Sequence, residues 1–165
     1  MFSVIIITIG IPGSGKSYWV YNYKKKHPLT HVISTDEIRK EVTGTYDCDP
    51  KDNDYIHNIA LERARTILNT ESVYPIEIII DATNCEMETW LSYKNLHPSI
   101  LRAIVFECTP EEAMRLQSLR ERVVPIEILQ NKWETIEKNK KYLIKIFNRV
   151  DIKTNKLLEY LRHNK

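Results

Sequence analysis

Eight residues near the N-terminus have the types and spacing of a phosphate-binding loop. Gly10–Ser17, with the sequence GIPGSGKS, matches the pattern G-x-x-x-x-G-K-[ST] in full. In such a loop, successive backbone N–H groups surround a phosphate, and the helix that begins near Lys16 directs its positive end toward it. We expect Lys16 to reach the β- and γ-phosphate oxygens and the Ser17 hydroxyl to bind the Mg²⁺ that bridges them. The predicted nucleotide contacts are Gly13, Ser14, Gly15, Lys16 and Ser17.

The distribution of glycine supports this interpretation. The chain has only four glycines, and three of them lie in this loop. Glycine allows a positive φ and a close approach of the backbone to a ligand. The sequence therefore predicts binding of ATP or another nucleoside triphosphate together with Mg²⁺.

A carboxylate follows a second apolar segment. Asp81 comes directly after 75–80, at the position where P-loop proteins often keep a carboxylate of the magnesium shell. The next residue is Ala82, where many hydrolysing ATPases have a Glu that orients water. This favours phosphate transfer to a bound acceptor over hydrolysis. The alternative is that Asp81 caps a helix or ends a strand without binding metal.

Two charged residues at the end of another short apolar segment could serve the acceptor. Asp36 and Arg39 are three positions apart on a predicted helix and therefore share a face. Asp36 could accept the proton of an attacking hydroxyl while Arg39 holds a phosphate of the acceptor. The alternative is that Asp36 only stabilises the start of a helix and that Arg39 is solvated.

Three arginines precede a break in the chain at 123–125. Arg115, Arg120 and Arg122 could place positive charge on the oxygens of the transferred phosphoryl group, on a lid at about 115–125. The alternative is an exposed basic helix end.

The segments that must position these residues alternate between strands and helices. Strands are predicted at 1–9, 31–34, 75–80, 101–107 and 149–153. Helices are predicted at 17–26, 35–41, 55–69, 86–96, 110–119, 126–147 and 154–163. Several of the strands are uniformly apolar, which is typical of a parallel sheet covered on both faces. We therefore predict an α/β protein with a parallel four- to five-stranded sheet, and a ligand site after Ile9, Ser34, Ile80 and Glu107.

Composition limits the remaining possibilities. A chain of 165 residues with 42% hydrophobic residues predicts a single domain, 1–165, and 24 basic against 22 acidic residues give a net charge of +2. A strongly basic nucleic-acid-binding domain is therefore excluded, but a local basic groove is not. The three cysteines are widely spaced, which argues against a disulfide scaffold or a zinc site. No segment has the length of a membrane span, so we expect an intracellular, cytoplasmic protein without membrane contact.

Together these residues resemble the polynucleotide 5′-hydroxyl kinase family, the kinase module of phage and bacterial nucleic-acid repair enzymes. The resemblance extends over roughly residues 3–142 in order. It rests on GIPGSGKS after the first strand, STDEIR at 34–39, DATN at 81–84, the arginine-bearing lid and VPIEIL at 124–129.

The resemblance implies a P-loop kinase fold and roles for particular residues. Asp36 would be the general base, Arg39 would contact the acceptor's adjacent phosphate, and the lid arginines would bind the donor phosphates. Arg115 matches the first lid position by its distance from 125, while Arg120 and Arg122 both remain candidates for the second.

We therefore predict an ATP-dependent phosphotransferase that acts on the 5′-OH end of DNA or RNA. One alternative is a kinase for another hydroxyl, such as a hydroxymethylated base in DNA, a tRNA-linked group or a small metabolite. A second alternative is an ATP-binding regulatory module without transfer activity. The near-neutral net charge mildly favours the first alternative, since a polynucleotide groove gains affinity from phosphate contacts. Arg39 distinguishes the two acceptors, because a small neutral acceptor has no phosphate for it to hold.

Overall fold

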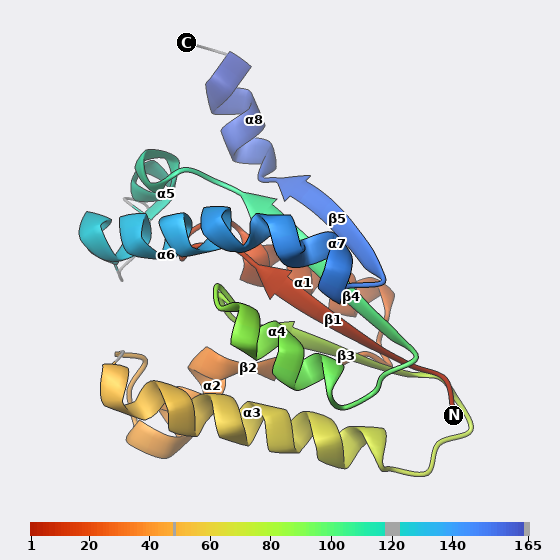
Figure 1. The fold of residues 1–165 in the computed structure, drawn as a ribbon. Coiled ribbons are helices and arrows are strands. Elements are labelled where there is room, and N and C mark those ends of the chain that lie inside the picture. Colours follow the sequence, from red (N-terminus) through yellow and green to blue (C-terminus); the bar gives the residue numbers. More distant parts are fainter. Residues whose placement is uncertain (48, 118–122, 164–165) are drawn as a thin grey trace.

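The computed structural model describes residues 1–47, 49–117 and 123–163 and places a parallel sheet at the centre of the protein (Figure 1). The five strands are β1 (Ser3–Ile9), β2 (His31–Ser34), β3 (Ile76–Asp81), β4 (Ile100–Glu107) and β5 (Arg149–Thr154). They are ordered β2-β3-β1-β4-β5, and every pairing is parallel. The predicted α/β class and parallel sheet are therefore confirmed.

Helices cover both faces of the sheet. They are α1 (Lys16–Lys26), α2 (Thr35–Thr43), α3 (Asn53–Leu68), α4 (Met87–Lys94), α5 (Pro110–Gln117), α6 (Ile126–Asn139), α7 (Leu143–Ile146) and α8 (Lys156–His163). Short 3₁₀ turns lie at Pro50–Asp52 and Lys140–Tyr142. Within the described residues, no helix is both long and apolar enough to cross a bilayer.

The apolar strands separate two hydrophobic cores. Ile6 of β1 packs with Ile79, Ile104 and Val20 of α1 on one face of the sheet. Its neighbours Ile5 and Ile7 belong to the larger core on the other face, which includes buried residues of α3, α4, α6 and α7. Burial of successive residues on opposite faces explains why β1 is apolar without alternation.

Two helix boundaries test the sequence prediction closely. Thr109 accepts from the Glu112 amide at 3.3 Å and its own amide donates to the Glu112 carboxylate at 3.0 Å, so the predicted capping box starts α5. The segment predicted as one helix at 126–147 is helical to Ile146, but it is divided, because α6 ends at Asn139 and a 3₁₀ turn leads into α7. The buried Asn139 side chain donates to the Cys85 carbonyl at 3.1 Å, a long-range contact made where the regular helix stops.

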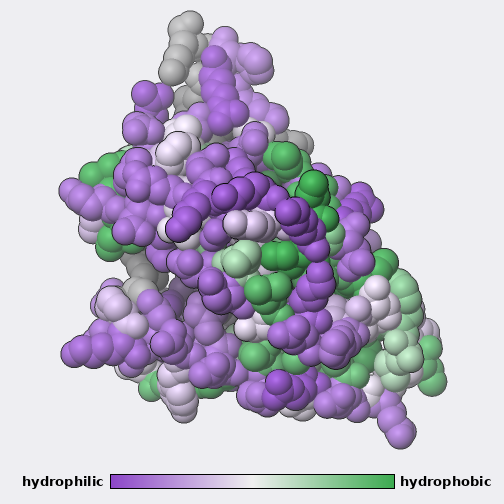
Figure 2. All heavy atoms as spheres, viewed as in Figure 1, coloured by the Kyte–Doolittle hydropathy of each residue, from purple (hydrophilic) through white to green (hydrophobic). Residues whose placement is uncertain are grey.

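The hydrophilic and hydrophobic residues are mixed over the face that carries α3 and α6. Figure 2 shows hydrophilic side chains over most of this face and hydrophobic ones in smaller patches.

The strand register places Ser34 opposite Asp81 and Glu107 opposite Thr154. Ile7 of β1 lies opposite Ile80 of β3, so the predicted site residues that follow β1, β2 and β3 lie at the same end of the sheet.

Candidate functional site

The glycine-rich loop between β1 and α1 has the backbone that a phosphate cradle requires. Gly13 and Gly15 have φ values of 85° and 98°, which L side chains rarely adopt. A Cβ at Gly13 would lie 3.1 Å from the Gln117 Cγ atom, and a Cβ at Gly15 would lie 2.8 Å from the Asn155 side-chain nitrogen. These positions therefore tolerate only glycine without strain or displacement of a neighbour.

The loop also holds a polar atom that lacks a partner. The Ser14 hydroxyl oxygen is buried and has no hydrogen-bond partner within the described part of the chain. Helix α1 begins at Lys16 with Gly15 at its N-cap, so no side chain caps its first amides. Unsatisfied donors of this kind at a helix N-terminus fit a phosphate group.

Lys16 is folded back into the loop. Its Nζ atom donates to the carbonyl oxygens of Gly10 and Ile11, each at 2.9 Å, and the side chain is buried. Burial lowers the pKa of Lys16, and the charges of Asp81 and Asp36 oppose that effect. An incoming triphosphate would supply the negative charge that a buried ammonium group needs.

Asp81 lies at the end of β3, beside Ser17. Burial raises the pKa of Asp81, while Lys16 and a hydrogen bond from Ser17 lower it. A carboxylate next to a hydroxyl is an oxygen pair that suits Mg²⁺. The alternative that Asp81 caps the following helix is excluded, because α4 begins at Met87 with Glu86 at its N-cap.

The segment after Asp81 is fastened to the phosphate loop. The Gly10 amide donates to the Thr83 carbonyl at 3.1 Å, and the Asn84 side chain donates to the Thr8 carbonyl at 2.7 Å. Asn84 itself has a φ of 46°, and its carbonyl accepts from the Trp90 indole at 2.7 Å. These bonds fix the end of β3 relative to the loop that Lys16 belongs to.

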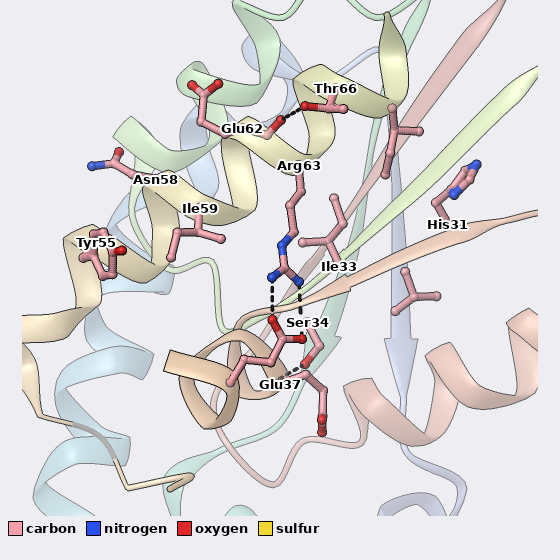
Figure 3. A pocket seen from close by; sticks show the side chains of 13 residues that line it. His31, Ile33, Ser34, Glu37, Tyr55, Asn58, Ile59, Glu62, Arg63 and Thr66 are labelled. Carbon is pink, nitrogen blue, oxygen red and sulfur yellow. Dashed lines mark hydrogen bonds and ion pairs between the residues drawn. The ribbon is translucent and has the colours of Figure 1, made fainter. Parts of the chain in front are cut away.

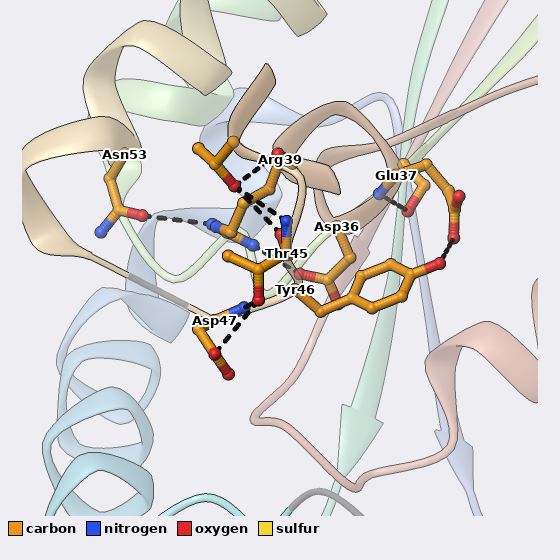
Figure 4. A network of polar contacts seen from close by, with 9 residues as sticks. Asp36, Glu37, Arg39, Thr45, Tyr46, Asp47 and Asn53 are labelled. Atoms are coloured by element: carbon orange, nitrogen blue, oxygen red, sulfur yellow. Dashed lines mark hydrogen bonds and ion pairs between the residues drawn. The ribbon is translucent and has the colours of Figure 1, made fainter. Parts of the chain in front are cut away.

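Asp36 and Arg39 form an ion pair on α2 (Figure 4). The Arg39 Nη1 atom is 2.6 Å from the Asp36 carboxylate, and Nη2 donates to the Asn53 side-chain oxygen at 3.2 Å. The Arg39 side chain is only 9% exposed, whereas Asp36 is 59% exposed. Arg39 is therefore a buried support beneath Asp36, and the alternative of a solvated Arg39 is excluded.

Asp36 also acts electrostatically on the phosphate loop. Its charge raises the pKa of both Lys16 and Asp81. Ser34, the N-cap of α2, lies opposite Asp81 in the strand register, so Asp36 in the first turn of α2 lies near the end of β3. These positions bring a candidate proton acceptor to the end of the sheet that carries the phosphate loop.

The predicted lid begins against the phosphate loop. Arg115 is exposed in the last turn of α5, while Arg120 and Arg122 lie outside the described residues. Gln117 of α5 contacts the Gly13 position, and its side-chain oxygen accepts from the Val124 amide at 2.6 Å. Sequence reasoning missed Gln117, and its spacing gives no signal that could have identified it.

The C-terminal part of the chain reaches the same loop. Asn155, which follows β5, lies against Gly15, and Arg162 of α8 pairs with Glu112 of α5 at 2.7 Å. A cavity of 200 Å³ adjoins the loop at Ile11 and is lined in part by Trp133. Asn155 was not among the predicted site residues, because only the tertiary fold brings β5 beside the loop.

A larger groove lies outside the predicted site. Its volume is 760 Å³, and it lies between the edge strand β2 and helices α2 and α3. Figure 3 shows Arg63 crossing it from α3, where the guanidinium pairs with Glu41. Residues of the phosphate loop do not line this groove, so the larger hollow is separate from the predicted nucleotide contacts.

Comparison with known proteins supports the fold. Residues 5–141 match the family model described as AAA domain. A chain in the structure of the Pnkp1/Rnl/Hen1 RNA repair complex has a TM-score of 0.72 and 18% identity, over 86% of this chain and 46% of that chain. A gluconokinase from Sinorhizobium meliloti 1021 has a TM-score of 0.63 and 18% identity, over 92% of this chain and 82% of that one.

A second structure of the Pnkp1/Rnl/Hen1 complex gives a TM-score of 0.59 at 21% identity, over 75% of this chain and 40% of that chain. The protein thus spans less than half the length of the chains that it matches in the two RNA repair complexes. The sheet, the loop and these similarities define a P-loop kinase-like fold. Because the family model covers 5–141 of the 165 residues, the chain belongs to the AAA domain family.

Proposed function

We propose that this protein is a phosphotransferase that moves the γ-phosphate of ATP to an alcohol, namely the 5′-hydroxyl end of DNA or RNA. The observation that carries the proposal is the position of Asp36. This exposed carboxylate lies in the first turn of α2, directly after Ser34, which is paired with Asp81 at the end of β3, and its charge raises the pKa of both Lys16 and Asp81. A regulatory module that only binds ATP has no need for a proton acceptor at that place.

The proposed reaction uses few protein groups. The acceptor hydroxyl gives its proton to the Asp36 carboxylate, and its oxygen forms a bond to the γ-phosphorus. The bond between that phosphorus and the β–γ bridging oxygen breaks, and ADP leaves with the bond's electron pair. Lys16 and Arg115 neutralise charge on the donor phosphates, with Arg120 or Arg122 as the second lid arginine. Positioning and charge neutralisation supply most of the acceleration in phosphoryl transfer.

Ser17 and Asp81 would hold the metal ion. Mg²⁺ bound there would neutralise the developing charge on the β- and γ-phosphate oxygens. The hydroxyl and the carboxylate are already in contact through a hydrogen bond, which lowers the pKa of Asp81 against the effect of burial. Both oxygens therefore lie together before any metal binds.

The nucleic-acid acceptor is supported by Arg39 and by the family resemblance. Arg39 keeps a buried guanidinium beside Asp36, and a positive group there suits an acceptor whose hydroxyl lies next to a phosphodiester. The likeness to chains of RNA repair complexes agrees with this choice.

A small hydroxylated metabolite is the second candidate acceptor. The segment that follows α2 is acidic, with Asp47, Asp49, Asp52 and Asp54. Tyr46, just before these residues, contacts α2, where its hydroxyl donates to the Glu37 carboxylate at 3.1 Å. Such negative charge opposes a long polyanion. The gluconokinase, which this chain matches over most of both lengths, agrees with a small acceptor.

A panel of acceptors tests the proposal. The full chain is incubated with Mg²⁺ and γ-labelled ATP, and with 5′-OH DNA, 5′-OH RNA, base-hydroxymethylated DNA, nucleosides or gluconate. We expect label on the 5′ ends of DNA or RNA and none with Lys16→Met. Label only on gluconate or on a modified base would favour the second candidate. Tight ATP binding without transfer to any acceptor would contradict a kinase function.

A further inference from the structure

We propose that the groove along the edge strand β2 binds an extended, basic segment of a protein partner, which adds to the sheet as a further strand. The groove has a volume of 760 Å³ and lies between β2 and helices α2 and α3 (Figure 3). Binding there would be separate from phosphate transfer, because neither the phosphate loop nor Asp36 nor Asp81 lines the groove. This docking surface therefore does not depend on the proposed reaction.

One side of the β2 backbone is free to pair with another strand. Within the described part of the chain, β2 pairs with β3 alone, at the end of the order β2-β3-β1-β4-β5. An edge strand of this kind presents N–H and C=O groups to a chain that lies beside it. All four residues of β2, His31–Ser34, line the groove. Because successive side chains point to opposite faces of a sheet, a single groove contacts all four only where it follows the backbone edge.

Part of the groove is lined by apolar side chains. Ile59 and Ile67 of α3 lie in it, and both pack against the larger core while remaining only partly buried. Val32 of β2 is 38% exposed, and Tyr55 in the first turns of α3 is 59% exposed. Alternate side chains of an added strand would lie against α3 on one face and beside Val32 on the other. Both sets of contacts would bury apolar surface, as in other cases of strand addition to a sheet edge.

The charges around the groove favour a basic occupant. Among the described residues that line it, three are glutamates, Glu37, Glu41 and Glu62, and one is an arginine, Arg63. Glu37 already accepts a hydrogen bond from Tyr46, which leaves Glu41 and Glu62 as the carboxylates for a ligand. Lysine or arginine side chains complement this lining, whereas a nucleic acid would be repelled. A second copy of the chain would bring the same glutamates together, so like charge also opposes pairing of two β2 strands.

The ion pair that crosses the groove can give way to a ligand. Figure 3 shows the Arg63 guanidinium reaching from α3 to the carboxylate of Glu41 on α2. The two side chains are 44% and 55% exposed, and exposed ion pairs stabilise a folded protein only weakly. A lysine of the partner would therefore replace Arg63 at Glu41 with little loss of stability.

A peptide of alternating lysine and valine, seven residues long, tests the proposal. The full chain is titrated with this labelled peptide, with its analogue that has glutamate in place of lysine, and with its analogue that has proline at the central valine. Proline removes a backbone donor and is unsuited to a paired strand. We expect fluorescence anisotropy to show that the lysine–valine peptide binds about tenfold more tightly than either analogue. Equal binding of the proline analogue would indicate charge attraction alone and contradict strand addition.

Two charge-reversal variants test where the peptide binds. Glu62 lines the groove, whereas Glu88 is an exposed residue of α4 outside it. We expect Glu62→Lys to weaken binding of the lysine–valine peptide about tenfold and Glu88→Lys to change it less than about twofold. Equal weakening by both variants would indicate a general effect of net charge and contradict the groove as the site. Urea denaturation of both variants checks that they remain folded.

Hydrogen exchange tests strand addition in the unmodified chain and does not depend on any variant. An amide that faces outward from an edge strand is protected only when a new hydrogen bond forms. We expect the lysine–valine peptide to slow exchange within His31–Ser34 and the proline analogue to leave it unchanged. Peptide binding without slower exchange in β2 would refute the proposal.

Two other occupants of the groove would also refute it. Protection of the β2 amides by a single-stranded oligonucleotide would assign the groove to nucleic acid. Sedimentation that shows a dimer of the free protein, dissociated by the lysine–valine peptide, would assign the free edge to a second copy of the chain. We expect the oligonucleotide to leave exchange in β2 unchanged and the free protein to show no such dimer.

Discussion

Replacement of Arg39 by lysine tests how strongly the buried guanidinium supports Asp36. Arg39 joins two partners, the Asp36 carboxylate at 2.6 Å and the Asn53 side chain at 3.2 Å. A lysine ammonium is a single point charge on a flexible stem and cannot reproduce the planar fork that reaches both. We therefore expect Arg39→Lys to keep at most one of the two contacts.

The expected loss follows from the burial of the two partners. A hydrogen bond to a charged group contributes about 1.5–3 kcal/mol, and the 59% exposure of Asp36 puts this pair at the lower end. Loss of one contact, partly replaced by the lysine, predicts a decrease of about 1–2 kcal/mol in the free energy of unfolding. That decrease corresponds to ~2–8 °C in the melting temperature of a domain of this size. Phosphate transfer should fall as well, because Asp36 loses its fixed orientation.

Arg63→Lys is the matched control. Arg63 pairs with Glu41 across the same two helices, but both side chains are about half exposed, at 44% and 55%. Exposed pairs contribute roughly 0.2–1 kcal/mol, so this variant should lose less stability and no transfer activity. Urea denaturation and a transfer assay compare the two variants. If Arg63→Lys is the more damaging change, or if Arg39→Lys behaves as wild type, burial of Arg39 does not have the role described.

Three further changes probe the phosphate loop and the end of β3. Gly13→Ala forces a Cβ to within 3.1 Å of Gln117 at a φ of 85°. At Gly44 an added Cβ meets open space, so Gly44→Ala costs only the left-handed strain of about 1–2 kcal/mol. Thermal denaturation should therefore show a larger loss of stability for Gly13→Ala than for Gly44→Ala. Lys16→Met removes a buried ammonium group, and burial already lowers the pKa of Lys16, so stability without nucleotide should be retained. Stabilisation by ATP, about 2.7 kcal/mol at an ATP concentration of a hundred times Kd, should vanish. Calorimetry measures both. Asp81→Asn should raise the free energy of unfolding at pH 7. Burial raises the pKa of Asp81, so at a pH above the ordinary carboxyl pKa of 3.8 the ionised side chain disfavours folding. Urea denaturation should show that the gain disappears at more acidic pH.

Local sequence patterns predicted the elements that carry the phosphate loop. The apolar run of β1 is buried on both faces, and the capping box at Thr109 starts α5 as expected. Such features depend on residues near one another in the chain. The change from α6 to a 3₁₀ turn was not predicted in this way, and the Asn139 side chain at that point bonds to Cys85, which lies far away in the sequence.

In the candidate site too, features set by local sequence could be predicted, and features set by tertiary packing could not. The pairing of Asp36 with Arg39 follows from helical spacing, and the structure places them together. The contacts of Gln117 and Asn155 with the glycine loop arise only when separate helices and strands pack. Their sequence neighbourhoods carry no motif, so the sequence alone offers no reason to select them.

The role of Asp36 is tested most directly by the rate at which Asp36→Asn transfers labelled γ-phosphate to a 5′-OH oligonucleotide. The substitution keeps the size of the side chain and removes the group that accepts the proton. Glu37→Gln, at the next and also exposed position of α2, is the control for loss of one negative charge. We predict that Asp36→Asn binds ATP as wild type does but transfers no measurable phosphate, while Glu37→Gln remains active. Full transfer by Asp36→Asn would contradict its assignment as the base.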